Sequence, residues 1–338
     1  MSASPAIQHL VSLQDVSDDT LREILDLSSD LKRVSAAPSL AGRSVGLLFF
    51  RRSLRTRTSF EAAVQGLGGH SINLNAASDF WDLEARSGVI MDGRAPEHIK
   101  DAARVLSRYV NLLAIRPAAE GHSWAADRKD ESIRAWAEHS EVPVINMESA
   151  IWHPLQALAD LMTMRESLGD LDGKQLTIAW THSPTPASPA VTHSLLHAAL
   201  RQGMNVRIAH PPGYELDEEV LAGASDLAQT KGRALESTSD LNQSVEGAHI
   251  IYARSWSSIK DYGNPTLVAS KRARTTDWKV DVDLLSLADN ARLMHAMPVR
   301  RNLEVTDEVL DSGRSLIYEQ AANRLYSQKA LLMKLLGQ

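Results

Sequence analysis

Residues 53–58, Ser-Leu-Arg-Thr-Arg-Thr, mix hydroxyl and guanidinium side chains and contain no acidic residue. The run follows the apolar segment 44–50, which is typical of a buried strand, and it precedes residues 60–67, which predict a helix that stops at glycine. A helix N-terminus presents backbone N–H groups and the positive end of the helix dipole, so it favours an anion. Because the hydroxyls and arginines add further donors, the pattern predicts a site for a phosphate or a phosphate ester.

The same arginines could instead form a solvated basic surface or a nucleic-acid patch, since Arg51, Arg52, Arg55 and Arg57 lie close together. Two features argue against this reading. The run is wedged between a predicted buried strand and a helix, and the whole chain carries a net charge of −6 with a pI near 6.1. We therefore expect a small anionic ligand and no nucleic-acid partner.

Length and composition set broad limits on the fold and the compartment. The 338 residues suggest two α/β domains of ordinary size, and a hydrophobic content of 43% allows sizeable cores. The chain has no cysteine, which excludes disulfides, zinc–thiolate sites and a cysteine nucleophile. No secretory signal and no apolar stretch of about 18 residues is present, so we expect a cytoplasmic protein without a membrane partner.

Strand-like and helix-like segments alternate along the chain, which predicts parallel sheets with helices on both faces. The expected strands are 45–50, 71–74, 112–115, 144–147, 176–180, 206–210, 249–252 and 292–296, and the expected helices are 19–33, 60–67, 98–108, 130–139, 156–168, 191–202, 217–230 and 321–336. We therefore predict two doubly wound α/β domains with the active site in the cleft between them. Residues 1–150 plus the C-terminal helix 321–338 would form one domain, and residues 151–320 would form the other.

Polar residues follow nearly every predicted strand, in both halves of the chain. In parallel sheets, ligands bind beyond the carboxyl ends of the strands. Arg116, Glu148, His153, Arg254 and Arg300 all lie just after strands. These positions predict one site that draws side chains from both domains.

Three of these segments match motifs of a known family. Residues 53–57 match Ser-x-Arg-Thr-Arg, residues 153–156 match His-Pro-x-Gln, and residues 295–300 correspond to His-Cys-Leu-Pro…Arg with two changes. Together they resemble the aspartate/ornithine transcarbamylase superfamily over nearly the whole chain. Segments 79–84 and 88–93 look more like the branch that carbamoylates N-acylated ornithine. Pro96 stands where the succinyl type has proline and the acetyl type has glutamate, so the resemblance favours N-succinyl-L-ornithine over N-acetyl-L-ornithine.

The resemblance implies transfer of a carbamoyl group from carbamoyl phosphate to a δ-amine in arginine biosynthesis, with no metal and no cofactor. Carbamoyl phosphate would be bound by Ser53, Leu54 (backbone), Arg55, Thr56, Arg57, Trp81, Arg116, His153, Gln156 and Arg300. The catalytic groups among these would be Thr56, Arg116, His153 and Gln156, and the acceptor amine would be bound by Glu148, Arg254, Met297 and Glu304. The family also forms homotrimers, in which Trp81 would reach a neighbouring subunit's site, and the branch threads its second domain through the loop 182–189 to make a knot.

Four positions depart from the family pattern, namely Ser183, Arg254, Ala296 and Glu304, and all of them fall on the acceptor side. Two other functions therefore stay open: a carbamoyltransferase for a different amine in another pathway, and a non-catalytic paralogue that keeps the anion site. His193 and His197 lie one helical turn apart and could hold a metal, but ordinary helix packing is the simpler reading.

Overall fold

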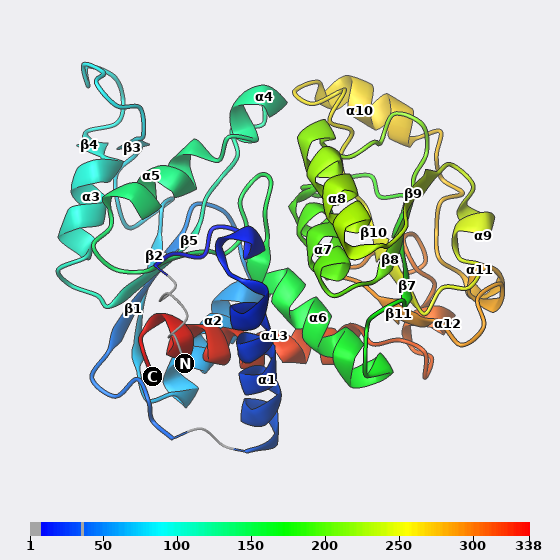
Figure 1. Cartoon of the computed structure of the whole chain (residues 1–338). Coiled ribbons are helices and arrows are strands. Elements are labelled where there is room, and N and C mark those ends of the chain that lie inside the picture. The colour runs from blue at the N-terminus through cyan, green and yellow to red at the C-terminus, as the bar shows by residue number, and fades with distance from the viewer. Residues whose placement is uncertain (1–7, 35–36) are drawn as a thin grey trace. The chain divides into compact units, whose positions relative to one another are not determined.

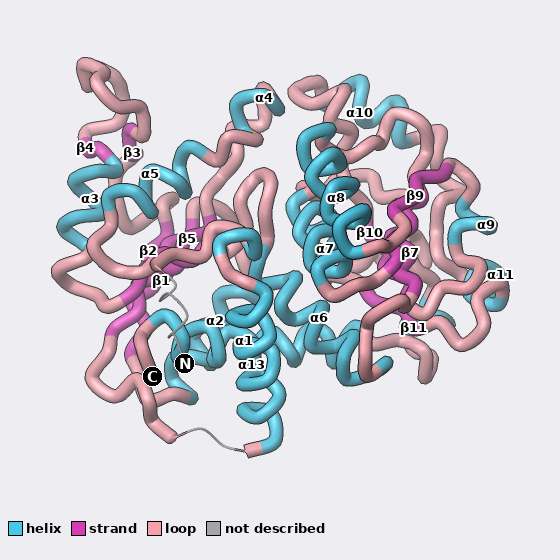
Figure 2. Tube along the Cα trace, viewed as in Figure 1, coloured by secondary structure: helices cyan, strands magenta, loops and turns pink. Residues whose placement is uncertain are grey.

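The computed structural model describes residues 8–34 and 37–338, and the chain divides into two compact units (Figure 1). Unit 1 runs to Glu120 and adds Ala125–Leu155 and Arg324–Gln338. Unit 2 consists of Gly121–Trp124 and Gln156–Asn323. Each unit holds one large parallel sheet, drawn in magenta in Figure 2, and unit 1 also holds the two-stranded sheet β3-β4, so the predicted pair of doubly wound parallel sheets is confirmed.

The sheet of unit 1 has four strands in the order β2-β1-β5-β6. The elements that belong wholly or partly to this unit are η1 Leu13–Asp15, α1 Asp18–Arg33, β1 Ser44–Phe49, α2 Arg55–Gly66, β2 His70–Asn75, β3 Leu83–Glu84, β4 Glu97–His98, α3 Ile99–Leu106, β5 Leu112–Arg116, α4 Trp124–Asp127, α5 Glu131–His139, β6 Val144–Asn146 and the last part of α13 Ile317–Leu335. Helices α3 and α5 lie on one side of the sheet, and α1, α2 and α13 lie on the other (Figure 1). Alternate strand residues such as Leu113 and Ile115 face α3 and α5 and form a core with Trp136.

The sheet of unit 2 has five strands in the order β11-β10-β7-β8-β9. Its elements are α6 Pro154–Leu168, which begins at the end of unit 1, β7 Gln175–Trp180, α7 Ala190–Arg201, β8 Asn205–Ala209, α8 Glu218–Lys231, β9 Leu235–Thr238, α9 Leu241–Ser244, β10 Ile250–Arg254, α10 Pro265–Arg272, α11 Val282–Ser286, β11 Arg292–Met294, α12 Asp307–Leu310 and the first part of α13. Strand β10 is buried along its whole length, as expected for a central parallel strand.

Three element predictions were wrong in detail. Helix α2 begins at Arg55 rather than at residue 60, so the arginine–threonine run forms the first turns of the helix and is not the loop before it. Hydroxyl residues favour turns, which is why the run resembled one. Helix α13 begins at Ile317 rather than at residue 321. Strand β9 was missed because it is a partly exposed edge strand, Leu-Glu-Ser-Thr, without an apolar run.

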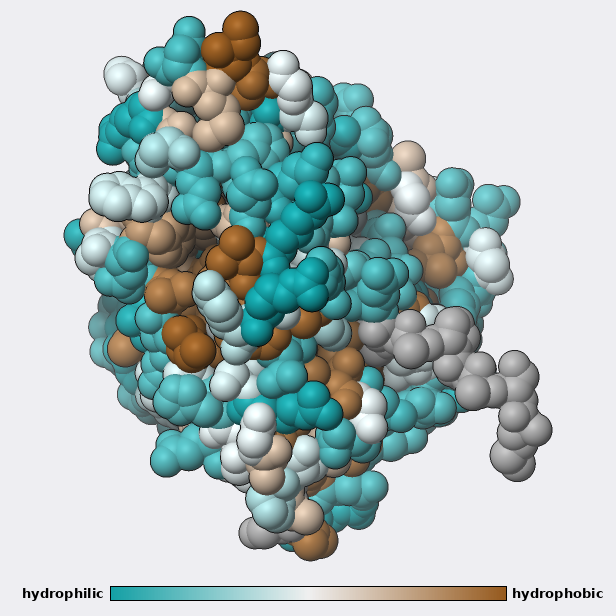
Figure 3. Space-filling view, turned by 90° about the vertical axis from the view of Figure 1, so that its left-hand side faces the viewer, coloured by the Kyte–Doolittle hydropathy of each residue, from teal (hydrophilic) through white to brown (hydrophobic). Residues whose placement is uncertain are grey.

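The face of the molecule seen in Figure 3 is mainly hydrophilic, with several apolar side chains near its middle. Trp81, Ile90 and Met91 lie between β2 and β4 and are among the exposed large apolar residues. Within residues 8–34 and 37–338, no helix is long and apolar enough to span a membrane.

Candidate active site

The N-terminal end of α2 forms one wall of the candidate site in unit 1. No side chain caps the first turn of this helix, and no acidic residue lies in that turn. The positive end of the helix dipole is therefore not offset by a carboxylate on the helix itself. Arg55 and Thr56 open the helix directly after its N-cap residue, Leu54, whose side chain is exposed.

Thr56 is buried, and its hydroxyl is shared by two guanidinium groups. Arg116 Nη1 donates to Thr56 Oγ1 at 3.1 Å, and Arg324 Nη2 donates to the same oxygen at 3.1 Å. Arg116 Nη1 also lies 3.4 Å from Ser53 Oγ. A hydroxyl oxygen has two lone pairs and one proton. Because both lone pairs accept from arginines, the Thr56 proton is left to be donated to an acceptor atom.

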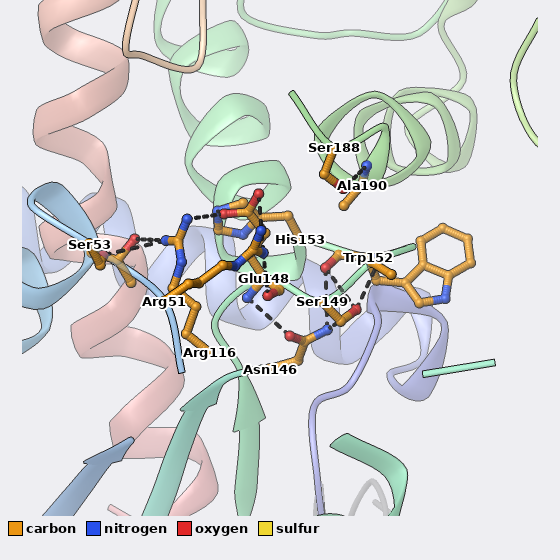
Figure 4. Close-up of polar contacts among 12 residues, drawn as sticks. Arg51, Ser53, Arg116, Asn146, Glu148, Ser149, Trp152, His153, Ser188 and Ala190 are labelled. Atoms are coloured by element: carbon orange, nitrogen blue, oxygen red, sulfur yellow. Dashed lines mark hydrogen bonds and ion pairs between the residues drawn. The ribbon is translucent and has the colours of Figure 1, made fainter. Parts of the chain in front are cut away.

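Glu148 lies against Arg116 and Arg51 (Figure 4). Its carboxylate accepts a hydrogen bond from Arg116 Nη2, and its Oε1 is 3.5 Å from Arg51 Nη2. Arg51 Nη2 also donates to the backbone oxygen of Glu148 at 2.8 Å. Glu148 has a φ of 150°, a backbone conformation that is unusual for a residue with a side chain. The surrounding turn must therefore hold it in place.

His153 is buried and neutral. Burial holds the pKa of His153 well below its usual value; the Glu148 carboxylate opposes this effect, while the charges of Arg324, Arg116 and Arg51 reinforce it. Arg324 Nη1 lies 3.4 Å from His153 Nε2, so this ring nitrogen faces the cluster.

The cluster as a whole is positively charged. The guanidinium groups of Arg51 and Arg116 contact the one carboxylate, that of Glu148, and a third guanidinium, that of Arg324, bonds to Thr56 beside them. With a neutral His153 and the N-terminus of α2, this balance suits an anion or the oxygen of a polarised carbonyl group.

The turn that carries Glu148 and His153 is fixed by a chain of polar contacts. Asn146 Oδ1 accepts from the Glu148 N–H at 3.0 Å, and Asn146 Nδ2 donates to Ser149 Oγ at 2.9 Å. Ser149 Oγ also accepts from the Trp152 N–H at 3.2 Å and donates to a carboxylate oxygen of Asp130. Asn146 and Ser149 are both almost completely buried, so these bonds are shielded from water.

A second group of predicted site residues lies in unit 2. His295 Nε2 and Glu304 Oε2 are 2.8 Å apart and both side chains are buried. Burial raises the pKa of Glu304, but the hydrogen bond to His295 and the nearby charge of Arg254 outweigh it, so the pKa is lowered. Arg254 is buried at the end of β10 and donates to the Ala296 carbonyl at 2.6 Å.

Two predicted phosphate ligands also belong to unit 2. Arg300 donates from Nε to Ser183 Oγ at 3.1 Å and from Nη2 to Thr185 Oγ1 at 2.6 Å, so it is held by the proline-rich loop. Gln156 donates to Asp160 Oδ1 at 2.8 Å, and Asp160 accepts from Gln320 at 2.7 Å. Their shares in carbamoyl phosphate binding stay predictions.

The remaining predicted residues lie apart from these clusters. Trp81 is 70% exposed, Met297 is half-buried, and Arg57 stacks its guanidinium 4.5 Å from the ring centre of Phe49. His193 and His197 are buried in α7, and His197 Nε2 contacts the Val220 carbonyl at 3.2 Å. Among the described residues, no group of three or more His, Cys, Asp or Glu side chains is placed to hold a metal ion.

Sequence reasoning missed three members of the unit 1 cluster, Arg51, Asp130 and Arg324. Arg324 lies near the start of the predicted helix 321–336, to which no role in the site was assigned. Asp130 was placed at the start of a helix, and no pattern around it pointed to the site. Arg51 belongs to the basic run but precedes the matching motif.

A two-unit, doubly wound α/β protein with an arginine-rich anion site at a helix N-terminus is the class that the fold and the site define. Comparison with known proteins narrows this class. Residues 8–166 match the model for the carbamoyl-P binding domain of aspartate/ornithine carbamoyltransferase, and residues 174–335 match the model for its Asp/Orn binding domain. The chain therefore belongs to the aspartate/ornithine carbamoyltransferase family, and it is a carbamoyltransferase.

Individual relatives cover the chain almost completely. It is 38% identical over 336 residues to an N-acetylornithine carbamoyltransferase of Xanthomonas campestris pv. campestris, covering 98% of this chain and 99% of the relative. It is 35% identical over 329 residues to an ornithine carbamoyltransferase of Synechocystis sp., covering 97% of this chain and 96% of the relative. A crystal structure of acetylornithine transcarbamylase complexed with acetylcitrulline is 38% identical, with a TM-score of 0.95 over 98% of this chain and 99% of that one.

Proposed function

We propose that the protein transfers the carbamoyl group of carbamoyl phosphate to the δ-amine of an N-acylated ornithine, giving an N-acylcitrulline and phosphate. N-succinyl-L-ornithine is the preferred acceptor in this proposal. The observation that carries the donor half is the convergence of Thr56, Arg116 and His153 beside the N-terminus of α2.

Each group of that cluster has a task in carbamoyl transfer. The amine attacks the carbonyl carbon, charge grows on the carbonyl oxygen, and phosphate leaves. Thr56, Arg116 and neutral His153 are donors suited to the carbonyl oxygen, where preorganised donors lower the barrier. Ser53, Arg55 and Arg57, at the start of α2, suit the phosphate. The phosphate leaving group is the base in this scheme and takes the proton of the attacking amine.

Glu148 has two constraints in this scheme. Its ion pair with Arg116 means that the carbonyl oxygen must share or displace that bond to reach the guanidinium. Its predicted role is to bind the acceptor, whose ammonium group would offer the carboxylate a new partner. In this scheme the Glu148 carboxylate gives up its ion pair with Arg116 when the two substrates bind. Arg116 is then free to donate to the carbonyl oxygen, and Glu148 is free to bind the ammonium group of the acceptor.

The acceptor preference rests on Pro96. This residue is exposed and directly precedes β4, within the segment that carries Trp81. In a related acetylornithine transcarbamylase, a glutamate-to-proline mutant is complexed with carbamyl phosphate and N-succinyl-L-norvaline, with a TM-score of 0.94 to this chain, 38% identity and coverage of 97% and 99% of the two chains. That complex supports the proposal, because a relative with proline in place of this glutamate binds a succinyl ligand.

N-acetyl-L-ornithine is the second candidate acceptor. The observation that favours it is that the relatives with the highest identity given above, in sequence and in structure, are named for acetylornithine. Arg254, Met297 and Glu304 would contact either acceptor. The proposal also includes a cytoplasmic homotrimer in arginine biosynthesis, with Trp81 completing a neighbouring subunit's site, and a knot formed by the proline-rich loop.

The acceptor is tested with purified protein, carbamoyl phosphate and one amine at a time: N-succinyl-L-ornithine, N-acetyl-L-ornithine and L-ornithine. We expect the highest kcat/KM with the succinyl compound, and we expect Pro96→Glu to move the preference towards the acetyl compound by about tenfold or more. Pro38→Glu, at an exposed proline outside the site, is the matched control. A wild-type enzyme that prefers N-acetyl-L-ornithine would establish the second candidate, and no citrulline product from any of the three would reject the proposed function.

A further inference from the structure

Asp130 is a buried carboxylate of unit 1 that has no part in the function described so far. It is 6% exposed and adopts the left-handed conformation, with a φ of 53°, at the N-cap position of α5. An aspartate at an N-cap ordinarily accepts a hydrogen bond from the first turn of its own helix. Asp130 makes no such bond. Its side chain instead faces the turn that follows β6.

That turn supplies the hydrogen bonds of the Asp130 carboxylate. Ser149 Oγ donates to Oδ2, and the Ala150 N–H donates to Oδ1 at 3.1 Å. The backbone of Ile151 contributes a further bond to the carboxylate. The Asp130 carboxylate therefore bonds to residues 149–151 and does not cap α5.

From Ser149 the bonds lead directly to the active site. Ser149 Oγ accepts from Asn146 Nδ2, and Asn146 Oδ1 accepts from the Glu148 N–H. Ser149 Oγ also accepts from the Trp152 N–H, and the next residue is His153. Figure 4 shows Asn146 and Ser149 below Glu148 and His153, with Trp152 to their right. The unusual backbone conformation of Glu148 persists only if this network holds it.

We propose that the Asp130 carboxylate is a positioning group for the carbamoyl-transfer site, holding the 148–152 turn through the Ser149 hydroxyl so that Glu148 and His153 face Arg116. The role rests on the proposed function, because it assigns Asp130 to the same reaction. Asp130 lies behind the reacting groups and touches neither substrate.

The bonding pattern presents a donor to each carboxylate oxygen of Asp130. Ser149 Oγ already faces two N–H donors, those of Asn146 and Trp152, so its single proton must go to an acceptor. An asparagine at position 130 would satisfy only one side. Its NH₂ group would meet either the Ser149 hydroxyl, which has no lone pair left, or the Ala150 N–H. Asp130→Asn is therefore nearly isosteric but breaks the network.

Protonation of Asp130 would break the network in the same way, because it turns one acceptor oxygen into a donor. Burial raises the pKa of Asp130 to about 6, against the opposing effects of Ser149, Ala150 and Arg134. Among the charged groups around Asp130, Arg134 lowers its pKa. The same pocket is also lined by Glu84, Arg86, Glu120, Asp127 and Glu131. Glu148 and the neutral His153 lie on the other side of the turn. The turn should therefore loosen as the pH falls through about 6.

The test uses the full-length protein in six forms: wild type, Asp130→Asn, Ser149→Ala, Ser149→Thr, the double variant Asp130→Asn with Ser149→Ala, and Glu131→Gln. Glu131 lines the same pocket but takes no part in the network, so Glu131→Gln is the matched control. For each form we measure kcat, the affinity for inorganic phosphate by calorimetry, and Tm. Amide NMR signals of Glu148 and Trp152 are followed from pH 5 to 8 in wild type and Asp130→Asn.

Asp130→Asn and Ser149→Ala should each lower kcat roughly 10–100-fold, since a small misplacement of reacting groups costs about that much. The double variant should lose no more than either single variant, because both remove the same link. Ser149→Thr, which keeps the hydroxyl, should recover most of the rate. Phosphate affinity should stay within about twofold, because the α2 cradle is untouched. The NMR signals should move with a midpoint near pH 6 only in wild type.

Three results would overturn the proposal: a kcat within about twofold of wild type in both single variants, losses that multiply in the double variant, or phosphate affinity and Tm that fall together with kcat. NMR signals without a wild-type midpoint near pH 6 would also reject it, whether or not turnover is seen. A wild-type enzyme that turns over none of the amines rejects the proposed function instead, and the NMR titration then decides on Asp130 alone.

Discussion

His153 owes its charge state to burial rather than to any one neighbour. An exposed histidine is partly protonated near neutral pH, but this ring is 3% exposed and lies near three guanidinium groups. The nearby Glu148 carboxylate does not overcome the loss of solvation. A neutral ring still donates one N–H, so it can stabilise a developing negative charge without holding a full positive charge in the protein interior.

His153→Ala should lower kcat roughly 100–1,000-fold, because it removes one preorganised donor from the carbonyl oxygen. The KM for carbamoyl phosphate should change far less, since the proposal assigns the phosphate to the N-terminal end of α2. Steady-state kinetics with the preferred amine test this expectation. His70→Ala, at an exposed position at the start of β2, should behave like wild type. A kcat for His153→Ala within about threefold of wild type would remove His153 from the mechanism.

Because the pKa of Asp130 is raised, ionisation of this carboxyl group lowers the free energy of unfolding near neutral pH. Its pKa is about 6 in the folded chain against 3.8 as the reference, so the folded state binds the proton more tightly. The stabilising contribution is present below about pH 4 and is lost as the pH rises through 6. Asp130→Asn does not titrate. Its free energy of unfolding relative to wild type should therefore rise by about 2 kcal/mol between pH 4 and pH 7, measured by urea denaturation.

If the free energy of unfolding of Asp130→Asn relative to wild type falls with pH, or does not change, Asp130 is already ionised well below pH 6 in the folded chain. Glu131→Gln, at an exposed carboxylate in the first turn of the same helix, is measured alongside as the control.

At the level of elements, two helices from opposite ends of the chain meet at the hydroxyl group of Thr56. Helix α2 presents Thr56, and α13 brings Arg324 to within 3.1 Å of the Thr56 hydroxyl. Strand β5 adds Arg116 from the third direction. Because Arg324 also faces His153, α13 influences both the hydroxyl donor and the imidazole donor.

Arg324→Met should lower kcat/KM for carbamoyl phosphate roughly 10–100-fold, the cost of about one hydrogen bond from a charged group. It should also raise the pKa of His153, because one of the charges that lowers it is gone. Steady-state kinetics and a histidine NMR titration measure the two effects. Lys334→Met, the same kind of change at an exposed ion pair on the same helix, should leave both unchanged. Equal effects of the two substitutions would show that α13 acts only through general stability.

At the scale of the whole molecule, the proposed trimer gives Trp81 its role. Trp81 is 70% exposed in a segment that also exposes Ile90 and Met91, and a lone subunit has no evident use for so much exposed apolar surface there. With 37.0 kDa per chain, sedimentation should report a particle of three chains.

Co-expressing a Trp81→Ala chain with a His153→Ala chain tests whether sites are shared. Each variant alone should be nearly inactive. Mixed trimers would contain some sites with an intact Trp81 from one chain and an intact His153 from the other, so activity should partly return. Mixing His153→Ala with Thr56→Val should restore nothing, since both residues belong to one chain's own cluster. No recovery in the first mixture would place Trp81 outside the neighbour's site.

Much of the fold followed from local patterns in the sequence. Apolar runs such as 45–50 and 112–115 predicted central parallel strands because both faces of such a strand are buried. Strand β9 and the true start of α2 did not follow, since an exposed edge strand lacks an apolar run and a polar first helical turn resembles a loop. Of the site, the residues directly after strands were predictable, whereas Arg324 and Asp130 carry no local signal.

The sequence by itself was enough to predict the anion site of this protein. Residues 53–58, placed between a buried strand and a helix, predict an anion site whatever the rest of the chain does, because helix termini and guanidinium groups bind anions through local geometry. Only the tertiary structure decided which distant groups complete that site. Arg324 meets Thr56 across 268 positions of sequence, and Asp130 reaches the active-site turn through Ser149. The neutral state of His153 likewise depends on burial and on charges from remote segments, which act on it only once the chain has folded.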